Sequence, residues 1–147
     1  MSFFKNIQSV NQQIMLPIFN ENNFKFYIKR EDQIHPTVSG NKFRKLKYNI
    51  KKAKEMNKQE ILTFGGAHSN HLLATAFMGK IEGLKTYGII RGEELKKLNY
   101  NSTLNKCQEL GMKFIFISRD DYRKRNELDY TKSISDLYTS AYIIPEG

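Results

Sequence analysis

The stretch SGNKFRKLKY, residues 39–48, predicts the fold of this chain together with FGGAHSNH, residues 64–71. In both stretches small residues lead into a segment whose apolar residues recur at helical spacing. Each is therefore expected to be a turn that opens a helix. The first turn offers amines, and the second offers hydroxyl, amide and imidazole groups. Such turns suit an anionic ligand, because a helix N-terminus carries unpaired N–H donors and a partial positive charge.

Hydrophobic periodicity on either side of these turns predicts alternating strands and helices. The expected helices are 43–57, 69–82, 101–111 and 126–140, and the expected strands are 24–30, 60–64, 85–90, 113–117 and 142–144. Residues 1–23 show little periodicity and are expected to be irregular, with a loop at 31–41. Strands that alternate with helices imply a parallel sheet with right-handed crossovers. The expected fold class is α/β, an open parallel sheet with helices on both faces.

Composition is typical of a soluble globular domain. The chain has 147 residues, of which 39% are hydrophobic and 12% aromatic, far too many aromatic residues for a disordered tail. Its net charge is +9, from 24 Lys and Arg against 15 Asp and Glu. This balance would favour anionic partners. The densest basic run, residues 42–58, lies on an expected helix and no nucleic-acid-binding motif accompanies it, so a solvated helix face is favoured over a nucleic-acid partner.

A single cysteine, Cys107, excludes an internal disulfide and fits a reducing compartment. It stands among the apolar positions of an expected helix, where packing is favoured over a nucleophilic role. The N-terminus has no signal-peptide pattern, and no apolar run approaches the length of a membrane span. The sequence therefore predicts a cytoplasmic protein without a membrane partner.

Lys42 is the candidate nucleophile of the first turn. In a chain this rich in basic residues most lysines face solvent, but Lys42 follows Gly40 and Asn41 at the start of a helix. Nearby positive charges and the helix N-terminus disfavour its ammonium form and favour a free amine, which could form a Schiff base with a carbonyl compound. Lys45, one turn further on, lies on nearly the same face and could hold a phosphate.

The second turn can be interpreted in two ways. In the simpler one Ser69 is only the N-cap of the following helix. In the other, Ser69 and Asn70, with the N–H groups of Asn70 and His71, hold a carboxylate. A metal site at His68 and His71 is not expected, because no third ligand stands at suitable spacing. A Ser69 nucleophile with His71 as base is disfavoured as well, because the G-x-S-x-G motif is absent.

The two stretches resemble the 1-aminocyclopropane-1-carboxylate deaminase / D-cysteine desulfhydrase family of fold-type-II, tryptophan-synthase-β-like enzymes. The resemblance continues through ISRDDYR at residues 117–123 and IPEG at residues 144–147, nearly the whole chain. It implies a lyase or deaminase that uses pyridoxal 5'-phosphate on a small amino-acid substrate. It also implies a homodimer for the full-length enzyme.

The resemblance assigns roles to the residues of both turns. Lys42 would form the Schiff base with the cofactor and exchange the substrate's proton, with Asn41 supporting its geometry. Lys45 would contact the cofactor phosphate, and Asn70 the ring 3′-oxygen. Ser69, together with the N–H groups of Asn70 and His71, would hold the substrate carboxylate. His68 departs from the family, which more often has glutamine or an aromatic residue there.

The resemblance also implies a division of the chain. Residues 1–43 would be an N-terminal arm of the large, cofactor-binding domain, residues 44–140 an α/β small domain, and residues 141–147 the start of the return to the large domain. Members of the family are about twice as long. The glycine-rich phosphate loop and the group that faces the pyridine nitrogen would lie beyond the point that matches Gly147. The chain is therefore expected to be incomplete, with little activity alone.

Two other functions remain open from the residues. One is a cysteine-synthase-like enzyme of the same superfamily. The other is a non-catalytic basic α/β module that binds an anion or nucleic acid through the helix that includes residues 45–58. Within the deaminase family, the sequence leaves both 1-aminocyclopropane-1-carboxylate and D-cysteine open as substrates.

Overall fold

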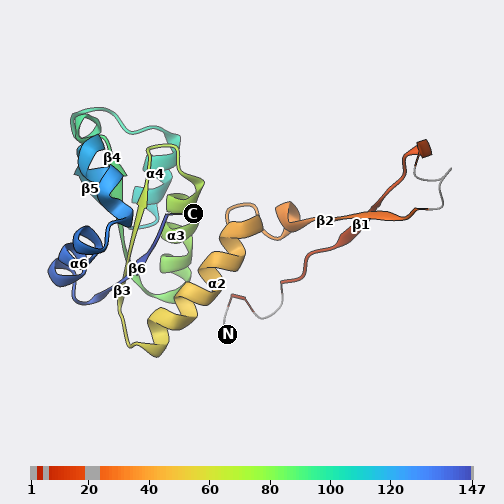
Figure 1. Cartoon of the computed structure of the whole chain (residues 1–147), viewed down its shortest axis with the longest axis horizontal. Coiled ribbons are helices and arrows are strands. Elements are labelled where there is room, and N and C mark those ends of the chain that lie inside the picture. Colours follow the sequence, from red (N-terminus) through yellow and green to blue (C-terminus); the bar gives the residue numbers. More distant parts are fainter. Residues whose placement is uncertain (1–2, 5–6, 19–23, 147) are drawn as a thin grey trace.

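The computed structural model describes residues 3–4, 7–18 and 24–146 of the chain, in the arrangement shown in Figure 1. The strands are β1 (Asn11–Ile14), β2 (Phe26–Lys29), β3 (Glu60–Gly65), β4 (Lys85–Arg91), β5 (Lys113–Ile117) and β6 (Ala141–Ile144). The α-helices are α2 (Gly40–Glu55), α3 (Asn70–Glu82), α4 (Ser102–Glu109), α5 (Arg119–Arg123) and α6 (Leu128–Leu137). Short 3-10 helices are η1 (Glu31–Gln33), η2 (Glu93–Lys97) and η3 (Lys124–Asn126).

The main sheet has four parallel strands in the order β5-β4-β3-β6. From β3 the chain builds outward through β4 to β5, and then crosses back so that β6 pairs with the other edge of β3. The direction of winding therefore reverses between β3 and β6. The carboxyl ends of strands at such a reversal are where open α/β sheets bind ligands.

Helices cover both faces of this sheet, as the fold class predicted. On one face, buried residues of α2, α3 and α4 pack against β3 and β4, with Ile61 and Ile90 facing them. On the other face, Tyr122 of α5 and Ile134 of α6 pack against Leu62 and Phe64 of β3. Consecutive residues of β3 thus serve opposite faces, as the alternation of side chains along a strand requires.

The helix sequences account for these positions. In α2 the buried residues are Phe43, Leu46, Ile50 and Ala53, a stripe at steps of three and four, and the lysines lie between them. In α3 residues 72–79 are apolar apart from Thr75, so the helix lies in the core between α2, α4 and the sheet. At Gly65 a Cβ atom would stand 2.6 Å from Cγ of Leu72, so glycine permits the close approach of the turn to α3.

Three predicted helix caps are confirmed. The side-chain oxygen of Ser69 accepts a hydrogen bond from the N–H of Leu72, and that of Asn101 accepts one from the N–H of Leu104. Gly83 ends α3 in the left-handed conformation, with φ 70°. These are the positions that N-caps and C-terminal glycines occupy in helices generally.

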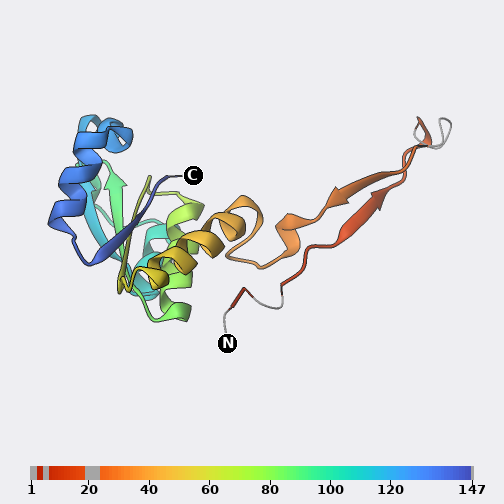
Figure 2. The same ribbon diagram turned by 60° about the horizontal axis from the view of Figure 1, so that its bottom comes forward.

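One expectation for the N-terminal segment is wrong. Residues 1–23 were expected to be irregular, but β1 forms within them and pairs antiparallel with β2, with Asn11 opposite Lys29 and Ile14 opposite Phe26. The rest of this expectation falls partly on residues 1–2, 5–6 and 19–23, which lie outside the described part. Figures 1 and 2 show the hairpin extending away from the body. Because β1 is polar and lacks alternation, its strand character comes from pairing with β2 rather than from its own sequence.

Several boundaries differ from the sequence prediction, among them the start of α2, which is Gly40 and not residue 43. The helix expected at 126–140 is shorter, Leu128–Leu137, and α5 before it was not predicted. The limit predicted between residues 43 and 44 falls within the first turn of α2, so the division into domains stays a prediction. In the described part of the chain, no helix combines the length and the apolar character that a membrane crossing requires.

Candidate functional site

The two turns singled out from the sequence meet one cavity. It has a volume of about 390 Å³, and Gly40, Asn41 and Lys42 from the start of α2 line it together with Asn70 from the start of α3. Asp32, Pro36, Thr37, Ser39 and Leu73 complete the described lining. The positive end of α2 and the first residue of α3 therefore face the same space, which suits a ligand with an anionic group.

Gly40 makes this geometry possible. Its φ of 57° is in the left-handed region, which glycine enters without a steric penalty. The chain reverses there and presents Lys42, the third residue of α2, to the cavity. The side chain of Lys42 is partly exposed, so its amine remains accessible to a small molecule.

Lys45 does not line this cavity in the structure. Its ammonium donates a hydrogen bond to the carbonyl oxygen of Pro145, directly after β6. Partial burial and the nearby charge of Lys42 lower the pKa of Lys45, while Glu146 acts in the opposite sense. Lys45 thus ties the first turn of α2 to the segment after β6.

His71 is one member of a buried hydrogen-bond network centred on Thr63, between the two strands at the reversal. Its side chain is 2% exposed, and Nε2 lies 2.9 Å from Oγ1 of Thr63. The Thr63 hydroxyl donates to the carbonyl oxygen of Ile144 at 2.8 Å, so Nε2 carries the proton and Nδ1 the lone pair. Burial, followed by the charges of Lys45 and Lys42, lowers the pKa of His71 to about 4. The imidazole is neutral near pH 7.

The polar residues of the second turn do not converge on one point. Asn70 faces the cavity, Ser69 caps α3 at 3.4 Å from the N–H of Leu72, and the His71 ring turns inward to Thr63. Ser69 does not line the cavity. The capping bond leaves the N–H groups of Asn70 and His71 without an acceptor within the helix, as is usual in a first helical turn.

His68 points away from His71. Both of its ring nitrogens lie 3.1–3.3 Å from Nδ2 of Asn101, which also donates to the carbonyl oxygen of Ala67. Within the described residues, no three His, Cys, Asp or Glu side chains are placed to share a metal ion. Asn101 was predicted only as a helix cap, and it also fixes the turn from Gly65 to Ser69.

A second group at the carboxyl edge was not predicted from the sequence. The guanidinium of Arg91 lies 5.8 Å from the ring centre of Tyr122, and that of Arg125 lies 4.8 Å from it. The Tyr122 hydroxyl donates to Glu146 at 2.7 Å, and Nε of Arg125 donates to the same carboxylate at 2.6 Å. Glu146 therefore anchors the segment after β6 on α5 and η3. The segments DDYR and PEG both belong to the stretches that resemble the family, but the contact between them could not be predicted from the sequence.

Cys107 is buried in the apolar cluster between α3 and α4, as predicted. Burial raises the pKa of its thiol to about 12, so the thiolate is scarce near pH 7. A packing role is confirmed by this environment.

Comparisons with known proteins agree with this architecture. No protein-family model matches the chain. A Thermotoga maritima protein, whose name assigns it to the 1-aminocyclopropane-1-carboxylate deaminases, is 36% identical over 126 residues, which are 84% of this chain and 39% of that protein. A mitochondrial bifunctional D-cysteine desulfhydrase/1-aminocyclopropane-1-carboxylate deaminase of Arabidopsis thaliana is 35% identical over 133 residues, 86% of this chain and 33% of that protein.

Solved structures match as well. The crystal structure of an ACC deaminase homologue superposes with a TM-score of 0.68 at 27% identity, covering 94% of this chain and 42% of the other. A hydrogen sulfide-producing enzyme of Fusobacterium nucleatum has a TM-score of 0.58 at 11% identity, covering 93% and 42%, and shows a shared fold alone. The chain thus spans about two fifths or less of the length of these relatives.

Proposed function

We infer the function of this chain from the family to which it belongs, the 1-aminocyclopropane-1-carboxylate deaminase / D-cysteine desulfhydrase family, of whose members it spans a part. From this premise we propose that it is the part of a pyridoxal 5'-phosphate-dependent deaminase or desulfhydrase that carries the cofactor lysine, Lys42. The substrate would be a small amino acid, with 1-aminocyclopropane-1-carboxylate and D-cysteine as the two candidates named by the relatives.

The observation that carries the proposal is the shared cavity of Lys42 and Asn70. The two residues are 28 positions apart in sequence and come from the starts of two different helices, yet both line one space of about 390 Å³. A lysine that lay on the surface by chance would not be expected to share a cavity with a polar residue at the start of another helix. Asn70 in the lining of this cavity precedes His71, which bonds to Thr63 of β3, and the winding reverses between β3 and β6, where open α/β sheets hold ligands.

The donor set fits part of pyridoxal 5'-phosphate. Lys42 offers an amine for the aldehyde carbon of the cofactor, and Asn70 offers an amide for a ring oxygen. Both residues line the cavity. The cofactor phosphate has fewer donors. The ammonium of Lys45 bonds to the carbonyl oxygen of Pro145 and would have to leave that oxygen to reach the phosphate. When bound, the cofactor supplies the electron sink for a carbanion beside the amino group.

The chain's own residues would then share the work of binding and proton transfer. The Nζ atom of Lys42 would hold the cofactor and take or return the substrate's proton, with Asn41 beside it. Ser69, together with the N–H groups of Asn70 and His71, would hold the substrate carboxylate at the positive end of α3. His71 would keep this end rigid through its bond to Thr63.

Borohydride trapping tests the role of Lys42. The chain is incubated with less than one equivalent of pyridoxal 5'-phosphate, reduced, digested, and the labelled peptides are measured by mass spectrometry. We expect labelling at Lys42 to exceed labelling at Lys51, an exposed lysine of the same helix. The Lys42→Ala variant should lose the preferred label, and Lys51→Ala should keep it. Labelling spread evenly over the lysines of α2 would contradict the proposal.

A further inference from the structure

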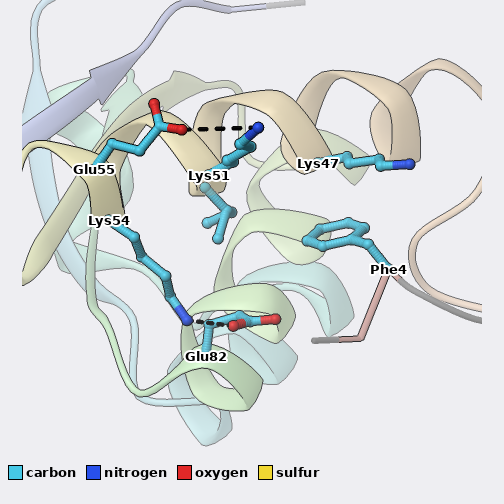
Figure 3. Close-up of a pocket in the computed structure, with 7 residues that line it drawn as sticks. Phe4, Lys47, Lys51, Lys54, Glu55 and Glu82 are labelled. Atoms are coloured by element: carbon cyan, nitrogen blue, oxygen red, sulfur yellow. Dashed lines mark hydrogen bonds and ion pairs between the residues drawn. The ribbon is translucent and has the colours of Figure 1, made fainter. Parts of the chain in front are cut away.

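A second cavity lies between α2, the end of α3 and Phe4, and it shares no lining residue with the cavity at Lys42. Its volume is about 580 Å³, within the range of about 300–1,000 Å³ that small-molecule sites occupy. Its described lining consists of Phe4, Lys47, Ile50, Lys51, Lys54, Glu55 and Glu82. Figure 3 shows the labelled members of this set around the opening.

Glu82 supplies a buried acceptor in this cavity. It is the last residue of α3, and its side chain is only 9% exposed. Its Oε2 pairs with the ammonium of Lys54 at 2.5 Å, whereas its Oε1 is buried and has no hydrogen-bond partner among the described residues. In Figure 3 this second oxygen is directed toward the side of the cavity where Phe4 lies. A buried carboxylate oxygen without a donor is costly, so a donor is expected there.

The wall beside Glu82 is apolar. Phe4 and Ile50 are 8% and 2% exposed, and both belong to the cluster that α2 and α3 form with β3 and β6. Since these side chains are already held by the core, they offer a preformed surface to an apolar group.

The rim of the cavity carries an unpaired positive charge. The ammonium of Lys51 lies 3.8 Å from Oε1 of Glu55, and the ammonium of Lys54 pairs with Glu82. Lys47 has no acidic partner among the residues that the structure describes. Three lysines against two glutamates leave a net charge of +1 on the lining, which disfavours a ligand that is only cationic.

We propose that this cavity binds an apolar amino acid as a zwitterion, in a site separate from the one at Lys42. The ammonium of the ligand donates to Oε1 of Glu82, its side chain packs on Phe4 and Ile50, and its carboxylate pairs with Lys47. Each of the three chemical features of the cavity is then matched by one group of the ligand. An amine or an acid alone matches only two of them.

Three probes separate these contributions: L-phenylalanine, phenethylamine, which lacks the carboxylate, and 3-phenylpropanoate, which lacks the amine. Each is titrated into the ¹⁵N-labelled chain, and the amide signals of Ile50 and Glu82 are followed beside those of Asn41 and Asn70. We expect L-phenylalanine to bind at least tenfold more tightly than either other probe, with shifts at Ile50 and Glu82. Shifts confined to Asn41 and Asn70, or no saturable binding of L-phenylalanine, would overturn the proposal.

Two substitutions give opposite patterns. In Glu82→Gln the amide oxygen stays with Lys54 and the NH₂ group turns into the cavity, so L-phenylalanine and phenethylamine should bind at least tenfold more weakly and 3-phenylpropanoate should not. Lys47→Met should weaken L-phenylalanine and should not weaken phenethylamine. Lys51→Met, which removes the rim lysine paired with Glu55 and leaves Lys47 in place, is the matched control and should not weaken L-phenylalanine. Equal weakening of all three probes by Glu82→Gln would contradict the assigned contact.

Discussion

The Nε2 atom of His71 lies 2.9 Å from Oγ1 of Thr63, and this bond determines which nitrogen of a buried imidazole carries its proton. Because the Thr63 hydroxyl donates to Ile144, only a protonated Nε2 completes the network. Three segments that are distant in the sequence, β3, α3 and β6, are joined in this way at the edge of the sheet. The cavity at Lys42 begins one residue away, at Asn70.

Thr63→Val should destabilise the chain. The substitution keeps the shape of the side chain but leaves the His71 Nε2–H group and the Ile144 carbonyl without partners. We expect the free energy of unfolding to fall by about 2–4 kcal/mol, measured by urea denaturation. Thr139→Val, at an exposed position, is the control and should change it by no more than about 0.5 kcal/mol. A loss as small as that of the control would show that the network contributes little.

Stability should depend on pH through His71. Its pKa is about 4 in the folded chain, below the value of about 6.5 expected after unfolding. Between these values the unfolded chain binds the additional proton, so the free energy of unfolding falls as the pH decreases from about 6.5 to about 4, by on the order of 3 kcal/mol. Urea midpoints measured across this range should show the slope.

His71→Gln tests whether the slope arises there. Glutamine can still donate to Thr63 but does not titrate, so the slope should largely disappear. His68→Gln, at an exposed histidine, should retain it. A slope unchanged in His71→Gln would assign the effect to other groups.

Gly83→Ala should lower the melting temperature. Apart from its chain neighbours, no atom of the described residues lies within 4 Å of the position of the added Cβ, so the cost comes from the left-handed backbone with φ 70° and not from a clash. We expect the free energy of unfolding to fall by about 1–2 kcal/mol, which thermal denaturation would show as a lower melting temperature. Gly83→Asn should lose less, because asparagine tolerates this conformation better than alanine. Equal losses for both variants would point to another cause.

The chain should bind pyridoxal 5'-phosphate only weakly. Among the described residues that line the cavity at Lys42, that lysine is the one cation, Asp32 lies on the same wall, and Lys45 is turned to Pro145. An absorbance titration should therefore show no stable band of a lysine-bound cofactor at equimolar concentration. A stable band at that concentration would contradict this expectation and would imply that Lys45 leaves Pro145.

Local sequence signals were sufficient for most elements of the fold. The stripe of α2, the caps at Ser69 and Asn101 and the glycine at 83 depend on neighbours within a few residues, and each was predicted. The polar strand β1 was missed because its pairing with β2 supplies what its own residues do not. The strand order could not be predicted either, because periodicity does not reveal which edge of β3 receives β6.

The contacts of the candidate site depend on distances in the sequence that no local pattern spans. Thr63 reaches Ile144 across 81 positions, and Lys45 reaches Pro145 across 100. The two turns and the family resemblance indicated that Lys42 and Asn70 share one site, but not that Lys45 and Thr63 hold the end of β6. Ser69, expected at the same site, serves the cap and lies outside the lining of the cavity.

The position of β6 beside β3 has a consequence for synthesis on the ribosome. β3 is the first strand of the parallel sheet to be synthesised, and β6, which pairs with one of its edges, follows only at residues 141–144. That edge of β3 therefore has no hydrogen-bonded neighbour strand while residues 66–140 are being translated. Such an edge invites pairing with other nascent chains. Until residues 141–144 have left the exit tunnel, this edge of β3 is open to such pairing.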